Sequence, residues 1–222
     1  MGKDGPYKKL VQKRKGCRLC EKLTNPAAFE NGRYDSDQIG PWSLWQHNLN
    51  ADIVIVGQDW GDTRYFEKWS GRDQNDGNPT NENLRRLLRY IGVIIGKPRE
   101  GQEQRVFLTN LILCLKTGGL QAPVAEDWFR SCAERFFKPL IEIIKPKAVL
   151  ALGKKTSEFI LNAYRVQYQP DAALKLLMGK SPYRLTSHTV LFPLYHCGAG
   201  SINRNRSFSE QLNDWEKIVS QF

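Results

Sequence analysis

The chain has 222 residues with 33 Lys and Arg against 23 Asp and Glu, so its formal net charge is +10. Apolar residues make up 41% and aromatic residues 11% of the sequence, which suffices for an ordinary core and excludes wholesale disorder. The longest apolar runs, at 148–152 and 190–194, fall far short of the ~20 residues that a membrane span needs. No secretory signal follows the basic N-terminus. We therefore expect a cytoplasmic monomer with no membrane contact, folded as one domain over residues 1–222.

Positive charge gathers in two parts of the chain. Residues 3–22 hold eight Lys or Arg against Asp4 and Glu21, and no acidic residue lies between Asp171 and Glu210. Stretches of one sign suit a polyanion, of which nucleic acid is the commonest example. A solubilising surface would give the same charges, so charge alone does not decide between the two.

Four segments have the nearly continuous apolar, β-branched character of strands that are covered on both faces: 52–56, 106–111, 148–152 and 189–194. Helical apolar stripes lie between and after them, at 84–91, 124–143, 154–164 and 207–222. Pro146 limits the second helix, and Ser207 with Glu210 predicts a capping box at the start of the last one. This order predicts a three-layer α/β/α sandwich around a central, mainly parallel four-stranded sheet.

Polar residues follow the predicted strands. The first strand is followed by Gln58, Asp59 and Trp60, the second contains Asn110, and the last is followed by His196. Ligands of open α/β sheets bind outside the carboxyl ends of the strands, so the sequence directs a carboxylate, an amide and an imidazole at one crevice. Taken singly, a polar residue after a strand is more often a turn former or a cap than a catalytic group, but three that converge at one edge favour a site. The glycines fit neither a P-loop nor a dinucleotide fingerprint.

Five cysteines are an odd number, so they cannot all pair in disulfides, and nothing in the sequence indicates export. Cys17-x-x-Cys20 is followed at long range by Cys114 and Cys132. A zinc ribbon would need a second close pair, which is missing. Four cysteines can also hold an iron–sulfur cluster, and Cys114 and Cys132 also suit buried core thiols, so the spacing leaves these alternatives open.

Several motifs together resemble the uracil-DNA glycosylase superfamily. They are residues 51–61 (ADIVIVGQDWG), the pair Thr109-Asn110 ahead of Cys114, Cys132 ahead of Ile144-Lys145-Pro146-Lys147, Leu150-Ala151-Leu152-Gly153, and the strand that ends in His196. The cysteine pattern is most similar to family 4 of that superfamily, whose members carry a [4Fe–4S] cluster. Two motifs depart from family 4: the first is Gly-Gln-Asp-Trp-Gly, and Cys197-Gly198 replaces Pro-Ser after the histidine.

The resemblance implies a role for each matching residue. Asp59 and His196 would be catalytic, with Asp59 orienting water and stabilising the sugar cation while His196 donates to the departing base. The base-binding residues would be Gln58, Trp60, Phe66 and Asn110. The candidates for the aromatic that stacks on the base are Trp60, Tyr65, Phe66 and Trp69, of which Phe66 is preferred. The loop of residues 198–206 is suited to DNA contacts, with Ile202 as a wedge and Arg204 and Arg206 on phosphates. The implied cluster ligands are Cys17, Cys20, Cys114 and Cys132, two of them in an N-terminal cluster-binding segment, residues 1–30.

The expected function is therefore that of a DNA glycosylase, a hydrolase that cleaves the N-glycosidic bond of uracil or another deaminated or modified base flipped out of DNA. An enzyme for an unusual modified base, for example in foreign DNA, is one alternative. A non-catalytic iron–sulfur protein that binds nucleic acid is another. The sequence leaves open whether the DNA is single- or double-stranded.

Overall fold

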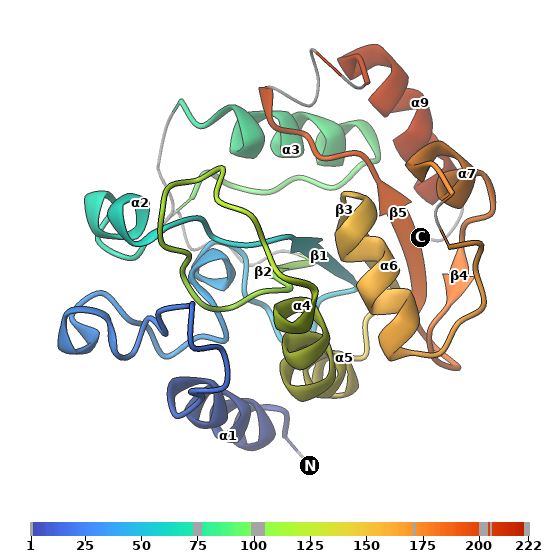
Figure 1. The fold of residues 1–222 in the computed structure, drawn as a ribbon. Helices are drawn as coiled ribbons and strands as arrows, with labels where there is room; N and C mark the ends of the chain where they lie inside the picture. The colour runs from blue at the N-terminus through green and yellow to red at the C-terminus, as the bar shows by residue number, and fades with distance from the viewer. Residues whose placement is uncertain are drawn as a thin grey trace.

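The computed structural model describes residues 2–72, 77–98, 105–170, 172–199, 204 and 206–219. Among these residues the strands form one sheet in the order β2-β1-β3-β5-β4 (Figure 1). Its parallel strands are β1 (Ile53–Gly57), β2 (Val106–Asn110), β3 (Ala148–Leu152) and β5 (Val190–Leu194). The short β4 (Tyr183–Arg184) pairs antiparallel with β5 at one edge. The four predicted strands are confirmed, and β4 is a fifth that the sequence analysis did not predict.

Helices cover both faces of the sheet, as the three-layer prediction requires. Alternate residues of β1 face opposite sides, so Val54 and Val56 join one apolar cluster and Ile53 and Ile55 the other. The first face is covered by α1 (Asp4–Lys15), α4 (Glu126–Cys132), the π-helical turn η3 (Ala133–Phe137), α5 (Lys138–Ile144) and α6 (Lys154–Ala163). The second is covered by α3 (Pro79–Tyr90) and α9 (Phe208–Val219), on the opposite side of the sheet in Figure 1.

Local chemistry explains where the predicted helices begin, bend and end. The stripe at 124–143 is helical from Glu126 but passes through η3, since Pro139 has no N–H to donate to the preceding turn. The last of these elements, α5, ends at Ile144. The next residue, Lys145, adopts a left-handed φ of 53° just before Pro146. At α9 the capping box is present: the Glu210 N–H donates to Ser207 Oγ at 3.3 Å, and the Ser207 N–H donates to Glu210 Oε2 at 2.9 Å.

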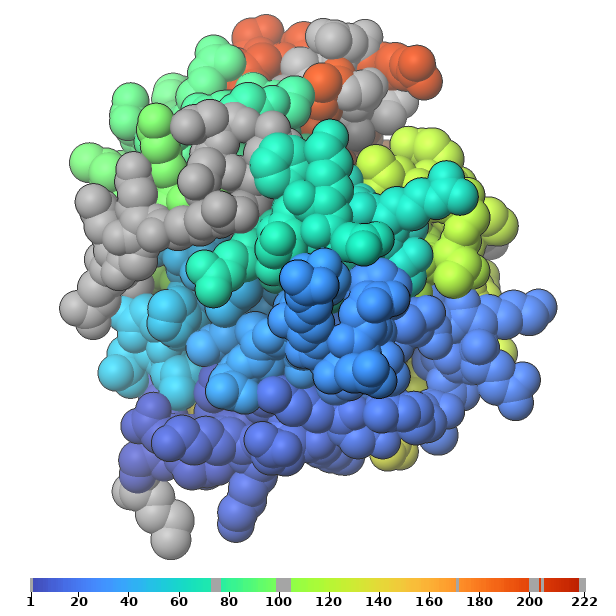
Figure 2. Space-filling view, turned by 90° about the vertical axis from the view of Figure 1, so that its left-hand side faces the viewer, coloured from blue at the N-terminus to red at the C-terminus, as the bar shows by residue number. Residues whose placement is uncertain are grey.

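The N-terminal third of the chain is more structured than its sequence indicated. The basic stretch at the start forms α1, which packs Tyr7, Leu10 and Val11 against the core. The remaining short helices are α2 (Thr63–Lys68), α7 (Leu174–Gly179), η1 (Phe29–Gly32) and η2 (Pro41–Leu44). In Figure 2 this third of the chain, in blue to teal, covers much of one side of the molecule. No helix of the described ranges is both long and apolar enough to cross a membrane.

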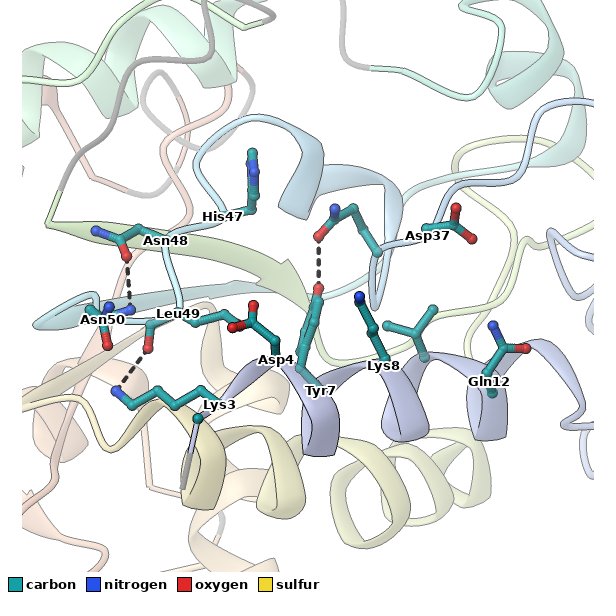
Figure 3. A pocket seen from close by; sticks show the side chains of 13 residues that line it. Lys3, Asp4, Tyr7, Lys8, Gln12, Asp37, His47, Asn48, Leu49 and Asn50 are labelled. Carbon is teal, nitrogen blue, oxygen red and sulfur yellow. Dashed lines mark hydrogen bonds between the residues drawn. The ribbon is translucent and has the colours of Figure 1, made fainter.

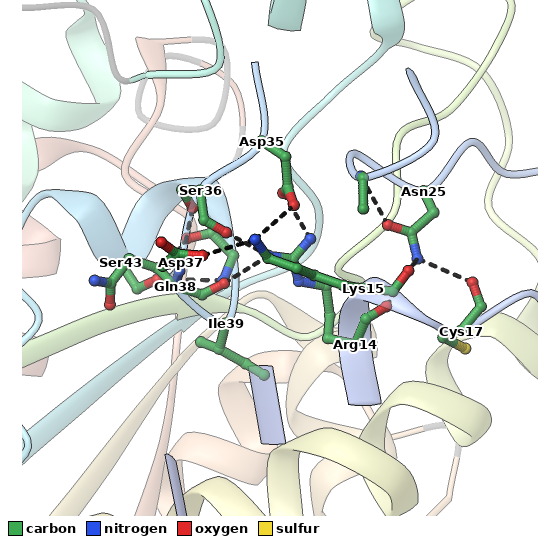
Figure 4. Close-up of polar contacts among 12 residues, drawn as sticks. Arg14, Lys15, Cys17, Asn25, Asp35, Ser36, Asp37, Gln38, Ile39 and Ser43 are labelled. Carbon is green, nitrogen blue, oxygen red and sulfur yellow. Dashed lines mark hydrogen bonds and ion pairs between the residues drawn. The ribbon is translucent and has the colours of Figure 1, made fainter. Parts of the chain in front are cut away.

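A buried ion pair joins α1 to the loop that follows it. Arg14 is 2% exposed, and its Nη1 lies 2.6 Å from Asp35 Oδ1 (Figure 4). Its Nη2 also donates to the carbonyl oxygens of Ser36 and Gln38, at 2.9 and 2.8 Å. A guanidinium taken out of water needs such partners to compensate for its lost hydration. Arg14 therefore holds the loop against the helix.

Replacement of Arg14 with Met should lower the free energy of unfolding by about 3 kcal/mol. It removes the nearest partner of the buried Asp35 carboxylate, which keeps only Lys15 Nζ at 3.5 Å, and it leaves the carbonyl oxygens of Ser36 and Gln38 without their donor. Urea unfolding followed by circular dichroism measures this change. Arg130→Met is the matched control, since Arg130 pairs with Glu126 at the exposed surface of α4 and should contribute less than about 1 kcal/mol. Equal losses of unfolding free energy in the two variants would contradict the conclusion that Arg14 holds the loop against α1.

Candidate active site

A cavity of about 690 Å³ lies at the carboxyl ends of the parallel strands. Five residues singled out in the sequence line it: Gln58, Asp59, Trp60, Asn110 and His196. They come together because β1, β2 and β5 are parallel and end at the same edge of the sheet. The crevice predicted from the strand ends is therefore present in the structure.

Gly57, the last residue of β1, shapes the floor of this cavity. It lies opposite Asn110 in the parallel register of β1 and β2. A Cβ at Gly57 would collide with Asn110 Oδ1 and would lie only 2.6 Å from Trp42 Cζ3. The absence of a side chain lets the amide of Asn110 and the ring of Trp42 approach the end of β1 from two sides. Trp42 comes from η2, in a part of the chain where the sequence predicted neither an element nor a site residue.

Asp59 is held by two neighbouring side chains. Its Oδ1 lies 3.2 Å from Lys116 Nζ, and its Oδ2 accepts a hydrogen bond of 2.7 Å from Gln58 Nε2. The side chains of Asp59 and Lys116 are only 8% and 5% exposed. Lys116 Nζ also donates to the carbonyl oxygen of Leu120 at 2.8 Å. Lys116 was not predicted as a site residue. Its only distinguishing feature in the sequence is its position two residues after Cys114.

Asn110 is buried at the end of β2, and within the described residues no protein group forms a hydrogen bond with its side-chain amide. An amide offers one acceptor and two donor hydrogens, and a buried amide without protein partners is costly unless a ligand or water satisfies it. Asn110 is thus suited to read the hydrogen-bonding edge of a bound group.

The imidazole of His196 has a defined tautomer. Its Nδ1 accepts a hydrogen bond of 3.0 Å from the N–H of Gly198, so Nδ1 carries no proton and the neutral ring bears its hydrogen on Nε2. Burial lowers the pKa of His196 below its usual 6.5, although the carboxylate of Asp59 acts in the opposite direction. His196 is therefore a neutral hydrogen-bond donor at neutral pH.

The structure does not bring every predicted site residue to this cavity. Phe66 is 1% exposed and packs among Phe29, Tyr34 and Trp60, away from the cavity. Ile202 lies outside the described residues.

The two arginines expected to contact phosphates differ in their surroundings. Arg204 is exposed. Arg206 forms two hydrogen bonds of 2.8 Å with Asp214 and one of 2.8 Å with Glu210, and its guanidinium lies over the ring of Tyr195. Its charge is therefore already paired within the protein.

The four predicted cluster cysteines line a second cavity, of about 270 Å³. Burial raises the pKa of Cys114 to about 12, and repulsion from the thiolates of Cys132, Cys17 and Cys20 adds to the increase. Such a set of neighbouring thiols deprotonates readily only beside a cation. Among the described residues no three His, Cys, Asp or Glu side chains lie close enough to hold a single metal ion. A four-iron cluster is larger than one ion, so its ligands need not converge on a point.

Hydrogen bonds from the Asn25 side chain and from the backbone hold the Cys-x-x-Cys segment in place. Asn25 Nδ2 donates to the carbonyl oxygens of Arg14 and Cys17, at 2.8 and 2.9 Å (Figure 4). Thr24 and Leu115 form an antiparallel bridge, with N–H···O distances of 2.9 and 2.8 Å. The segment is thereby attached to the loop that follows β2 and contains Cys114.

A larger cavity, of about 910 Å³, lies between α1 and residues 37–50 (Figure 3). Its polar groups are largely committed to the fold: Tyr7 Oη donates to Gln38 Oε1 at 2.9 Å, and Lys3 Nζ donates to the carbonyl oxygen of Leu49 at 3.0 Å. Burial raises the pKa of Tyr7 to about 12. This cavity lies beside the segment that enters β1, away from the strand ends where Asp59, Asn110 and His196 gather.

The protonation state of His196 can be measured by nitrogen-15 NMR of the imidazole rings. We expect a neutral ring with the hydrogen on Nε2 and a protonation midpoint below 6.5, with His196→Asn identifying the signal. Because the folded pKa is the lower one, the stability linked to this group is complete above pH 6.5 and declines as the pH falls through the folded pKa. A hydrogen on Nδ1 or a midpoint above 6.5 would contradict this description.

Comparison with known proteins shows the family of the chain. Residues 44–218 match the uracil DNA glycosylase superfamily. The chain is 26% identical over 189 residues to a type-4 uracil-DNA glycosylase of Sulfurisphaera tokodaii, covering 79% of this chain and 76% of that protein. It is also 26% identical over 174 residues to a type-4 uracil-DNA glycosylase of Archaeoglobus fulgidus, covering 77% of each chain. The chain belongs to the uracil-DNA glycosylase superfamily, in which its similarity is to the type-4 enzymes.

Proposed function

We propose that this protein is a DNA glycosylase that hydrolyses the N-glycosidic bond of uracil or another deaminated base in DNA. The observation that supports this most is the meeting of Asp59, Asn110 and His196 in one cavity at the strand ends. A carboxylate, a base-reading amide and a neutral donor are the groups that this reaction needs. The two type-4 relatives are named as uracil-DNA glycosylases, which favours uracil as the base.

Asp59 acts on the sugar. As the bond between C1′ and the base nitrogen breaks, positive charge develops on the deoxyribose, and an ionised carboxylate held beside it stabilises that charge. Asp59 also accepts a hydrogen bond from the water whose oxygen attacks C1′. Lys116 and Gln58 keep the carboxylate in position through the contacts at 3.2 and 2.7 Å.

His196 and Asn110 act on the base. The departing base takes the electron pair of the broken bond, and the Nε2–H of His196 donates to the base oxygen on which negative charge develops. Asn110 accepts from the ring N–H of uracil and donates to its 4-oxo group. Cytosine presents the opposite pattern at this edge and would leave the buried amide mismatched, at a cost of about 1–3 kcal/mol.

Trp42 is our candidate for the aromatic that stacks on the base, in place of Phe66. It lines the cavity across Gly57 from Asn110, so a base held by that amide lies beside the indole ring. Trp60 is a second indole that lines the cavity. Its ring packs edge to face against that of Tyr65, with 5.9 Å between the ring centroids. The side-chain amide of Gln58 donates a hydrogen bond to Asp59. We therefore assign Gln58 a positioning role rather than a contact with the base.

The expected partner is DNA. A base inside a duplex must be extruded before it enters a cavity at a sheet edge, and the net charge of +10 suits the phosphate backbone. Arg204, which is exposed, is available for such a contact. The expectations of a single domain and of a cytoplasmic monomer remain predictions.

We also propose that Cys17, Cys20, Cys114 and Cys132 hold a [4Fe–4S] cluster, with residues 1–30 as the cluster-binding segment. The four thiols line one cavity, and iron would offset their mutual repulsion when they ionise. The cluster's contribution would be structural, since it would cross-link the N-terminal segment to the loop after β2. Cys197 is buried elsewhere, with its thiol directed at the carbonyl oxygen of Thr80.

Base release from oligonucleotides that carry a panel of altered bases, detected as alkali-sensitive strand breaks, tests the function. Wild-type protein should release uracil, and Asp59→Asn should slow release at least about a hundredfold without weakening DNA binding. Asp37→Asn is a matched control, since Asp37 is an exposed carboxylate paired with Lys15. Release of a different base alone would favour the modified-base alternative, and binding without release of any base would favour the non-catalytic one.

Iron and sulfide analysis of anaerobically purified protein tests the cluster. We expect about four of each per chain and a brown colour. Cys114→Ala and Cys132→Ala should lose iron, whereas Cys197→Ala should retain it because its thiol lies outside the cysteine cavity. One zinc per chain in place of iron would contradict the proposal.

A further inference from the structure

A single peptide unit connects the imidazole of His196 to helix α3. The N–H of this peptide, which belongs to Gly198, donates to His196 Nδ1 at 3.0 Å. Its carbonyl oxygen, which belongs to Cys197, accepts a hydrogen bond of 2.9 Å from Asn83 Nδ2 on α3. The C=O and N–H of a trans peptide point in opposite directions within one plane. Asn83 and the imidazole are therefore joined by two hydrogen bonds across one rigid unit.

The turn of residues 196–198 packs closely against the start of α3. Cys197 is fully buried, and its Sγ lies 3.5 Å from the carbonyl oxygen of Thr80. A Cβ at Gly198 would lie only 3.0 Å from both His196 Nδ1 and Thr80 Oγ1. Glycine at this position thus lets the peptide fit between the helix and the imidazole.

Asn83 itself stands back from the active-site cavity. Residues 78–81, at the start of α3, line that cavity, whereas Asn83 does not. Its side chain is half-buried, and its amide donates to the turn. A donor committed to a loop carbonyl fixes that loop at the expense of a bond to water. Asn83 can therefore influence the reaction through the turn without touching the substrate.

We propose that Asn83 is a positioning residue that sets the tautomer of His196 through the Cys197–Gly198 peptide. This inference rests on the proposed function, in which the Nε2–H of His196 donates to the departing base. Donation by Asn83 polarises the peptide and strengthens the hydrogen bond that its N–H makes. It also fixes the peptide plane, so the N–H stays directed at Nδ1. With Nδ1 accepting, the neutral ring carries its hydrogen on Nε2.

Loss of the Asn83 amide acts on the rate and leaves the affinity for DNA in place. The Cys197 carbonyl loses its donor, and the peptide is free to turn away from the imidazole. The hydrogen of His196 then distributes between Nδ1 and Nε2, so fewer molecules present the donor that the reaction needs. A general loss of packing at α3 would instead affect binding and stability together.

Nitrogen-15 NMR of the imidazole measures the tautomer independently of catalysis. In Asn83→Ala and Asn83→Asp, the Nδ1 and Nε2 shifts of His196 should move towards each other from their wild-type values. Aspartate has the shape of asparagine but offers no hydrogen when ionised at about pH 8, so Asn83→Asp separates the donated bond from packing. Glu82→Ala is the matched control, because Glu82 precedes Asn83 on α3 and pairs with Arg85 at 3.2 Å.

Single-turnover uracil release with excess protein measures the effect on the reaction. Asn83→Ala should lower the maximal rate about tenfold and change the half-saturating protein concentration less than about twofold. Asn83→Asp should be at least as slow, and Glu82→Ala should match wild type. In the His196→Ala background, Asn83→Ala should change the residual rate less than about twofold, because a residue that acts through His196 then has nothing to act on.

The outcomes separate this inference from the proposed function. Wild-type protein that releases no base would overturn the function, while the NMR spectra would still decide whether Asn83 sets the tautomer. An unchanged His196 tautomer in both Asn83 variants would overturn the inference alone. A tenfold loss that persists in the His196→Ala background would also overturn it. Asn83→Asp keeps the volume of the side chain and carries the same test if Asn83→Ala does not fold.

Discussion

The parallel register of β1 and β2 is the constraint on which the site depends. It sets Gly57 opposite Asn110, so one strand ends without a side chain where its neighbour presents an amide. The side chains of Trp42 and Asn110 occupy the space at Gly57, and both line the cavity with Asp59 and His196. A one-residue slip between the strands would turn Asn110 to the other face of the sheet and remove this arrangement.

Buried charges are paired at two places that matter for different reasons. Arg14 and Asp35 join α1 to the loop around it, whereas Asp59 and Lys116 lie in the site. Burial of two charges gains little net stability, because their attraction is offset by lost hydration. At the site the benefit is positional, because Lys116 fixes the orientation of the Asp59 carboxylate. Lys116 Nζ also donates to the carbonyl oxygen of Leu120, so this lysine connects the Asp59 carboxylate to the loop that contains Leu120.

Three consecutive residues connect the cysteine cavity to the active site. Cys114 lines the cysteine cavity, Leu115 pairs with Thr24 of the N-terminal segment, and Lys116 meets Asp59. Cys114 is therefore only two residues away from Lys116, the lysine that pairs with the Asp59 carboxylate. Through the bridge between Thr24 and Leu115, the N-terminal segment is attached to the same short stretch of chain.

The sequence by itself determined the sheet, the strand-end residues and the relation to the superfamily. Strands such as β3 are apolar on both faces, so pattern alone identifies them, and parallel order directs Asp59, Asn110 and His196 to one edge. Tertiary structure alone decided that Trp42 and Lys116 line the cavity and that Phe66 does not. Those side chains are placed by loops and by contacts between segments far apart in the chain, for which local periodicity carries no signal.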